Sequence, residues 1–140
     1  MAAEPQRPVV LAVDDSTDLL ALMAKALTTD YDVRTAESGA EGLKLLAGKQ
    51  QPALILLDVE MPGEDGFEIC KRIKANPQAA DIPVIFLTGR SEAKYQTQGF
   101  EIGAADYVTK PINVAVLRAR VRAQIALANQ RIALERINVS

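Results

Sequence analysis

The sequence contains no histidine, no tryptophan and a single cysteine, Cys70. The absence of histidine excludes histidine-based catalytic triads, histidine phosphocarriers and most transition-metal sites. One cysteine cannot form an intrachain disulfide, so we expect a reducing compartment, with Cys70 as a small apolar helix residue. Proton or phosphoryl chemistry must therefore use Asp, Glu, Lys, Ser, Thr or Tyr.

Long apolar runs are also missing. No segment approaches the roughly 18 uninterrupted apolar residues of a membrane span, and the N-terminal MAAEPQRP lacks a signal-peptide core. We therefore expect a cytoplasmic protein with no membrane partner. The formal net charge of −2 argues against direct nucleic-acid binding, which needs a strong basic excess.

The 140 residues, 49% hydrophobic and 24% charged, fit one folded domain. Short apolar or β-favouring runs alternate with segments of helical spacing, and the runs cover 8–13, 31–36, 52–57, 82–87 and 105–109. Continuously apolar runs are typical of strands that are covered on both faces. The alternation predicts an α/β fold with a parallel sheet.

The intervening segments carry helix signals. Ser16 is a good N-cap for the first helix, and Ser38 with Glu41 predicts a capping box at the second. A third helix should end near Asn76–Pro77, a weaker polar one follows residue 90, and a long one covers about 112–137.

Polar residues follow four of the predicted strands: Asp14 and Asp15, then Asp58, Thr88 and Lys110. The carboxyl ends of parallel strands share one edge of the sheet, so these side chains can converge there. Three mutually close carboxylates would repel one another by roughly 10 kcal/mol at an effective dielectric constant of about 20. The cluster therefore requires protonation or a cation, and oxygen ligands favour Mg²⁺ together with Lys110.

Each residue also has an ordinary structural interpretation. Asp14 or Asp15 could cap the first helix, Asp58 could cap a turn, and Thr88 and Lys110 could be solvent-facing loop residues. The turn chemistry of EDG at 64–66 precedes the third helix. All five residues at the ends of four predicted strands are much less expected by chance than any one of them alone.

Four motifs match one family in order and spacing: VDDS (13–16), LLDVEMPGEDGFE (56–68), PVIFLTG (83–89) and DYVTKPI (106–112). On these residues the chain resembles a receiver domain of two-component response regulators. The resemblance implies a flavodoxin-like (βα)5 doubly wound sheet of strand order 2-1-3-4-5, extended here by a long last helix.

The resemblance also implies residue roles. Asp58 would accept a phosphoryl group from a phosphohistidine of a sensor histidine kinase or a histidine phosphotransfer protein. Asp15, Asp58 and the main-chain carbonyl of Glu60 would bind Mg²⁺, with Asp14 acting through water. Lys110 and the Thr88 hydroxyl would contact phosphoryl oxygens.

Further family features fall on identifiable positions. Thr88 and Tyr107 would form the conformational switch, and Lys110–Pro111 would be a cis peptide. Glu60 and Arg90 would tune phosphoryl lifetime, either through a salt bridge over the site or as two separately solvated side chains.

We expect a tail at 1–7, a receiver domain at 8–127 and a helix extension at 128–140. Val121, Ile125, Ala128 and Ile132 recur at heptad spacing, which favours a homodimer through this helix. A frayed tail is the alternative, because two heptads fall short of the three or four that define a coiled coil. The sequence leaves open a stand-alone receiver or a fragment of a longer regulator.

Two other functional classes compete with a signalling switch. A Mg²⁺-dependent phosphohydrolase of the haloacid-dehalogenase-like type also uses a strand-end aspartate, but its DxDxT pattern is only faintly echoed by Asp58-Val59-Glu60. A non-phosphorylated pseudo-receiver would be favoured if one of the five strand-end residues were missing, and none is. We therefore expect no catalysis beyond self-phosphorylation from phosphodonors and slow autodephosphorylation.

Overall fold

The computed structural model describes residues 7–89 and 93–138. The strands in this part of the chain are β1 (Val9–Val13), β2 (Asp32–Ala36), β3 (Leu54–Asp58), β4 (Glu60–Met61), β5 (Glu64–Asp65), β6 (Val84–Thr88) and β7 (Asp106–Thr109). The helices are α1 (Thr17–Leu27), α2 (Gly39–Leu46), α3 (Gly66–Ala75), α4 (Ala93–Ile102) and α5 (Val114–Asn138).

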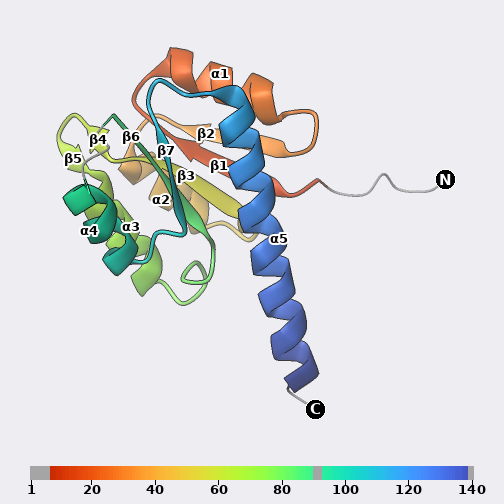
Figure 1. Ribbon diagram of the computed structural model, residues 1–140. Helices are drawn as coiled ribbons and strands as arrows, with labels where there is room; N and C mark the ends of the chain where they lie inside the picture. The colour runs from red at the N-terminus through yellow and green to blue at the C-terminus, as the bar shows by residue number, and fades with distance from the viewer. Residues whose placement is uncertain (1–6, 90–92, 139–140) are drawn as a thin grey trace.

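Five of the strands form one parallel sheet in the order β2-β1-β3-β6-β7 (Figure 1). This is the predicted order 2-1-3-4-5, because β4 and β5 form a separate hairpin between the third and fourth strands of the sheet. The register pairs Val13 with Ala36 and with Leu57, and Thr88 with Thr109. The strands therefore end at one edge, as the alternation of strands and helices predicted.

Helices cover both faces of the sheet. Side chains of α1 and α5, among them Met23 and Leu117, pack on one face, and those of α2 and α3, among them Leu46 and Phe67, pack on the other. Strand residues alternate between the two clusters, which explains why both faces of each central strand are apolar.

Local signals set the helix starts. The Ser16 side chain accepts the Leu19 N–H at 3.2 Å and the Ser38 side chain accepts the Glu41 N–H at 3.1 Å. The expected capping box is wrong in one detail, since Glu41 Oε2 accepts the N–H of Glu37, at 3.0 Å, in place of the Ser38 N–H. Glu41 therefore accepts the N–H of the residue that precedes the N-cap Ser38.

The β4–β5 hairpin was not predicted. Its strands pair Glu60 with Asp65 and Met61 with Glu64, and Gly63 in the turn has φ +71°, a conformation that favours glycine. Asp65, in the predicted EDG turn, is the N-cap of α3 and accepts the Phe67 N–H at 2.9 Å.

The last helix is continuous from residue 114 to 138, and its C-terminal end extends beyond the body of the domain (Figure 1). Val121 and Ile125 face the sheet and are buried in the core, so they cannot also contact a second copy while α5 keeps this position. Leu127, Ile132 and Leu134 are exposed. Within the described residues, no helix has the apolar length that a membrane crossing requires.

Candidate functional site

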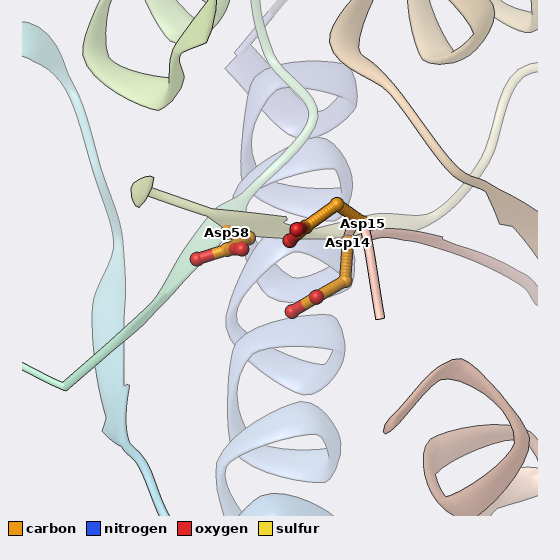
Figure 2. Close-up of side chains that lie close together, drawn as sticks. All are labelled: Asp14, Asp15 and Asp58. Carbon is orange, nitrogen blue, oxygen red and sulfur yellow. The ribbon is translucent and has the colours of Figure 1, made fainter. Parts of the chain in front are cut away.

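Three carboxylates meet at the carboxyl edge of the sheet. Asp14 and Asp15 directly follow β1, and Asp58 is the last residue of the neighbouring strand β3. One oxygen of each lies within 4.8 Å of the others, and Figure 2 shows the three side chains together. Asp14 and Asp58 are buried, while Asp15 is exposed. The predicted convergence of these residues is therefore present.

Short loops hold the two buried carboxylates in place. Asp14 Oδ1 accepts the N–H of Ser16 at 2.9 Å, and Asp58 Oδ1 accepts the N–H of Glu60 at 3.1 Å. Both are side-chain turns over two residues, so Asp58 does cap a turn, whereas the N-cap of α1 is Ser16 and neither Asp14 nor Asp15. The second oxygen of each remains for another function.

Lys110 supplies the positive charge of the site. Its Nζ lies 3.1 Å from Asp14 Oδ2 and 3.2 Å from Asp58 Oδ1. The Lys110 N–H donates to the Thr88 carbonyl at 2.8 Å, which fixes the loop after β7 against the end of β6. The Lys110–Pro111 peptide bond is cis.

The single positive charge of Lys110 does not neutralise the three carboxylates Asp14, Asp15 and Asp58. Burial raises the pKa of Asp58 to about 6; the charge of Asp14 also raises it, whereas the Glu60 N–H and Lys110 oppose the change. Burial also disfavours the charged form of Lys110, but the hydrogen bond to Asp14 and the charge of Asp58 outweigh it and raise its pKa. The site therefore carries an excess of negative charge that favours a cation, and it keeps its lysine protonated.

The donor set fits a hard divalent cation. Asp58 Oδ2 is buried and accepts no hydrogen bond within the described residues, and the buried Asp14 Oδ2 has only the ion pair with Lys110 Nζ at 3.1 Å. Buried oxygens in this state cost free energy unless a cation or donor reaches them. Carboxylate oxygens without imidazole or thiolate suit Mg²⁺.

Thr88 ends β6 beside Asp58 and is buried, so it is not a solvent-facing loop residue. Tyr107 is also buried, and its hydroxyl donates to the Gln96 carbonyl of α4 at 2.9 Å. The Tyr107 ring lies between Phe86 and Phe100, with centroids at 5.6 and 5.1 Å. The two predicted switch residues thus lie on adjacent strands, one at the site and one against α4.

The structure describes only one residue of the predicted Glu60–Arg90 pair. Glu60 is exposed at the start of the hairpin, and Arg90 lies outside the described residues. This pair stays a prediction.

Sequence reasoning missed the contacts that build the loop after Asp58. Glu64 reaches the first turn of α2, and Gly66 packs on the Asp58–Val59 backbone so closely that a Cβ there would overlap the Asp58 carbonyl. The EDG segment signalled a turn, but nothing local indicated its long-range partner.

Residues 10–122 match the model of the response regulator receiver domain. This chain belongs to that family. A solved structure of the Vibrio cholerae chemotaxis protein CheY4 matches with a TM-score of 0.79 at 30% identity, covering 84% of this chain and 98% of that one. The receiver domain thus has the predicted fold and belongs to two-component signalling, where it supports a phosphoacceptor switch.

Two curated relatives are longer than this chain. A probable cyclic di-GMP phosphodiesterase of Vibrio cholerae is 44% identical over 117 residues, which are 83% of this chain and 26% of that protein. The transcriptional regulator RpaA of a Synechocystis strain is 42% identical over 117 residues, covering 83% of this chain and 48% of that protein. The chain therefore spans about a quarter to a half of these relatives, and the activities in their names remain theirs.

Proposed function

We propose that Asp58 of this receiver domain accepts a phosphoryl group from the phosphohistidine of a sensor histidine kinase or of a histidine phosphotransfer protein. The observation that carries the proposal is the buried Asp58 carboxylate at the sheet edge, with Lys110 Nζ at 3.2 Å and the Asp14 and Asp15 oxygens within 4.8 Å. Phosphoryl transfer depends mainly on such positioning and charge neutralisation.

The transfer needs no general base, because a carboxylate is already a nucleophile. An Asp58 oxygen donates an electron pair to phosphorus, and the P–N bond breaks with its pair remaining on the imidazole nitrogen. The products are an aspartyl phosphate and a neutral imidazole, because the phosphoimidazole ring reacts with a proton on its other nitrogen. Lys110 and the Thr88 hydroxyl are the groups that would bind phosphoryl oxygens.

A Mg²⁺ ion bound by Asp15, Asp58 and the Glu60 carbonyl, with Asp14 acting through water, would neutralise charge on the phosphoryl oxygens. Asp58 is the nucleophile of the transfer, so the residue that attacks phosphorus is also a metal ligand. Asp14 then keeps Lys110 oriented through the 3.1 Å ion pair.

Phosphorylation would bias a two-state element that begins at Thr88, the last residue of β6, and continues to Tyr107 of β7. Drawing Thr88 toward the phosphoryl group would change the space next to Tyr107, whose hydroxyl joins β7 to α4 through Gln96. The output surface would then be α4, β7 and α5. This surface would control homodimer formation or an effector.

For the homodimer, the exposed residues favour a seam different from the predicted heptad. Leu127 and Leu134 are seven residues apart and exposed, and both lie in the C-terminal half of α5. Of the predicted residues, Ala128 is half-buried and Ile132 is exposed, but both lie on the face of α5 that carries Ile125 and borders Pro52 and Pro83. The proposed seam therefore consists of Leu127 and Leu134.

The test is the intact mass of wild type and Asp58→Asn after incubation with a small phosphodonor and saturating Mg²⁺. We expect one phosphoryl adduct on wild type and none on the variant. A wild type without adduct would make the domain a non-phosphorylated interaction module. An adduct that persists in Asp58→Asn would mean that another residue is the acceptor.

A further inference from the structure

We propose that Glu64 is a positioning residue that holds the β4–β5 hairpin, and with it the main-chain carbonyl of Glu60, where Mg²⁺ binding requires it. This inference rests on the proposed function, in which that carbonyl is a metal ligand.

The hairpin is too short to hold itself. Its ladder consists of two residue pairs, Glu60 with Asp65 and Met61 with Glu64, around a turn that contains Gly63. An isolated two-stranded hairpin is marginal in water even when it is longer. Contacts outside the hairpin must therefore fix its position.

The hairpin has two such contacts within the described residues, one of which is Met61, buried in the core. Glu64 provides the other. Its Oε1 accepts the Gly39 N–H at 2.8 Å and its Oε2 accepts the Ala40 N–H at 3.0 Å. These are first-turn amides of α2 that have no partner inside their helix, and the helix dipole favours a carboxylate there. Both oxygens are used in charge-assisted hydrogen bonds, which are the strong class.

The packing around this contact is tight. A Cβ at Gly39 would lie 2.5 Å from Ile69 Cδ1 and 3.0 Å from Glu64 Oε2, so no side chain fits between the helix and the hairpin. Glu64 and the α2 terminus therefore meet at a fixed distance.

The base of the hairpin is tied to the phosphoacceptor strand. The Gly66 N–H donates to the Val59 carbonyl at 3.0 Å, and the Glu60 N–H donates to Asp58 Oδ1 at 3.1 Å. With its base fixed at Asp58, the remaining freedom of the hairpin is movement of its outer part, which Glu64 restrains together with the buried Met61. Loss of the Glu64 contact should thus displace the segment that begins at Glu60.

The experiment compares Glu64→Ala with Glu41→Ala. Glu41 caps the same end of α2 by accepting the Glu37 N–H at 3.0 Å and carries the same charge, but it is joined to Glu37 and not to the hairpin. Mg²⁺ dissociation constants come from amide chemical shifts during a Mg²⁺ titration. Initial rates of Asp58 phosphorylation come from intact mass at low and saturating Mg²⁺.

We expect Glu64→Ala to weaken Mg²⁺ binding about tenfold, the lower end for residues that orient metal ligands. Its phosphorylation rate should fall at low Mg²⁺ and recover at saturating Mg²⁺, while metal-free hydrogen exchange of the hairpin amides should accelerate. Glu41→Ala should keep the wild-type dissociation constant. Glu64→Gln retains one acceptor oxygen, so its Mg²⁺ dissociation constant should lie between those of wild type and Glu64→Ala.

An unchanged dissociation constant in Glu64→Ala would overturn the inference. Equal weakening in Glu41→Ala would overturn it too, because general loosening of α2 or loss of charge would then explain the effect. A wild type that binds Mg²⁺ but forms no adduct at Asp58 would instead overturn the proposed function, and the binding comparison would still decide the role of Glu64.

Discussion

Tyr107 occupies the space that a side chain at position 99 would need. A Cβ built on Gly99 in α4 would overlap the Tyr107 hydroxyl oxygen and lie 3.0 Å from Phe86 Cδ2. The absence of a side chain at Gly99 therefore permits the inward position of Tyr107, in which its hydroxyl reaches the Gln96 carbonyl.

We expect Gly99→Ala to lower the free energy of unfolding by about 1–3 kcal/mol, the usual cost of overpacking. In the Tyr107→Ala variant, Gly99→Ala should raise the free energy of unfolding by up to about 1 kcal/mol, because alanine is a better helix former than glycine. Urea unfolding of the four proteins measures this coupling. An equal cost in both backgrounds would contradict the contact.

The raised pKa of Asp58 makes stability depend on pH. With a folded-state pKa of about 6 and an ordinary value of 3.8, the native state holds a proton that the unfolded chain has released. The stabilisation is thus full below about pH 4, and it is lost as pH rises through about 6. We expect a loss of about 2–3 kcal/mol in chelator-treated protein.

Urea unfolding from pH 4 to pH 7 in the presence of a chelator tests this dependence. Asp58→Asn should flatten the profile and be more stable than wild type at pH 7, since its amide does not ionise. Glu68→Gln removes an exposed carboxylate that pairs with Lys71 at 3.2 Å, and it should keep the wild-type slope. A wild-type profile that rises from pH 4 to pH 6 would refute the assignment to Asp58.

Mg²⁺ should stabilise the folded domain by mass action. At 100 times the dissociation constant, the gain is about 2.7 kcal/mol, which raises the melting temperature by roughly 5–10 °C. Asp15→Asn should abolish the shift while leaving the buried Asp14–Lys110–Asp58 contacts intact. An equal shift in wild type and Asp15→Asn by scanning calorimetry would place the cation elsewhere.

Lys110→Met should leave two buried carboxylates without their cation. We expect the free energy of unfolding at pH 7 to fall by about 3 kcal/mol in metal-free protein, with a smaller loss at pH 5, where Asp58 takes up a proton. The phosphorylation rate should fall as well. Lys71→Met, which removes an exposed lysine, is the control; a loss at pH 5 as large as at pH 7 would argue against charge as the cause.

The proposed seam on α5 predicts a change in oligomeric state. Leu127→Glu combined with Leu134→Glu should convert a dimer to a monomer, because charged groups would have to be buried at the centre of the seam. Light scattering of phosphorylated and unphosphorylated protein measures this. Leu22→Glu, at an exposed leucine of α1, should have no effect. If the wild-type protein is monomeric with and without phosphorylation, the proposed homodimer is refuted.

The sequence alone determined the parallel α/β fold and the identity of the edge residues. The central strands β1, β3 and β6 are predicted by continuous apolar runs. The starts of α1 and α2 are predicted by Ser16 and Ser38, whose side chains cap the first turn. Parallel strands must end at one edge, so Asp14, Asp58 and Lys110 were brought together by connectivity.

Tertiary structure decided what depends on contacts between distant segments. The Glu64 carboxylate meets α2 across 25 residues of sequence, and Tyr107 meets Gly99 across an interface between a strand and a helix. The heptad through Val121 and Ile125 was ambiguous for a related reason: a stripe that packs on the domain's own sheet has nearly the same spacing as a coiled-coil seam. Spacing along a helix identifies an apolar face, and only packing identifies what covers that face.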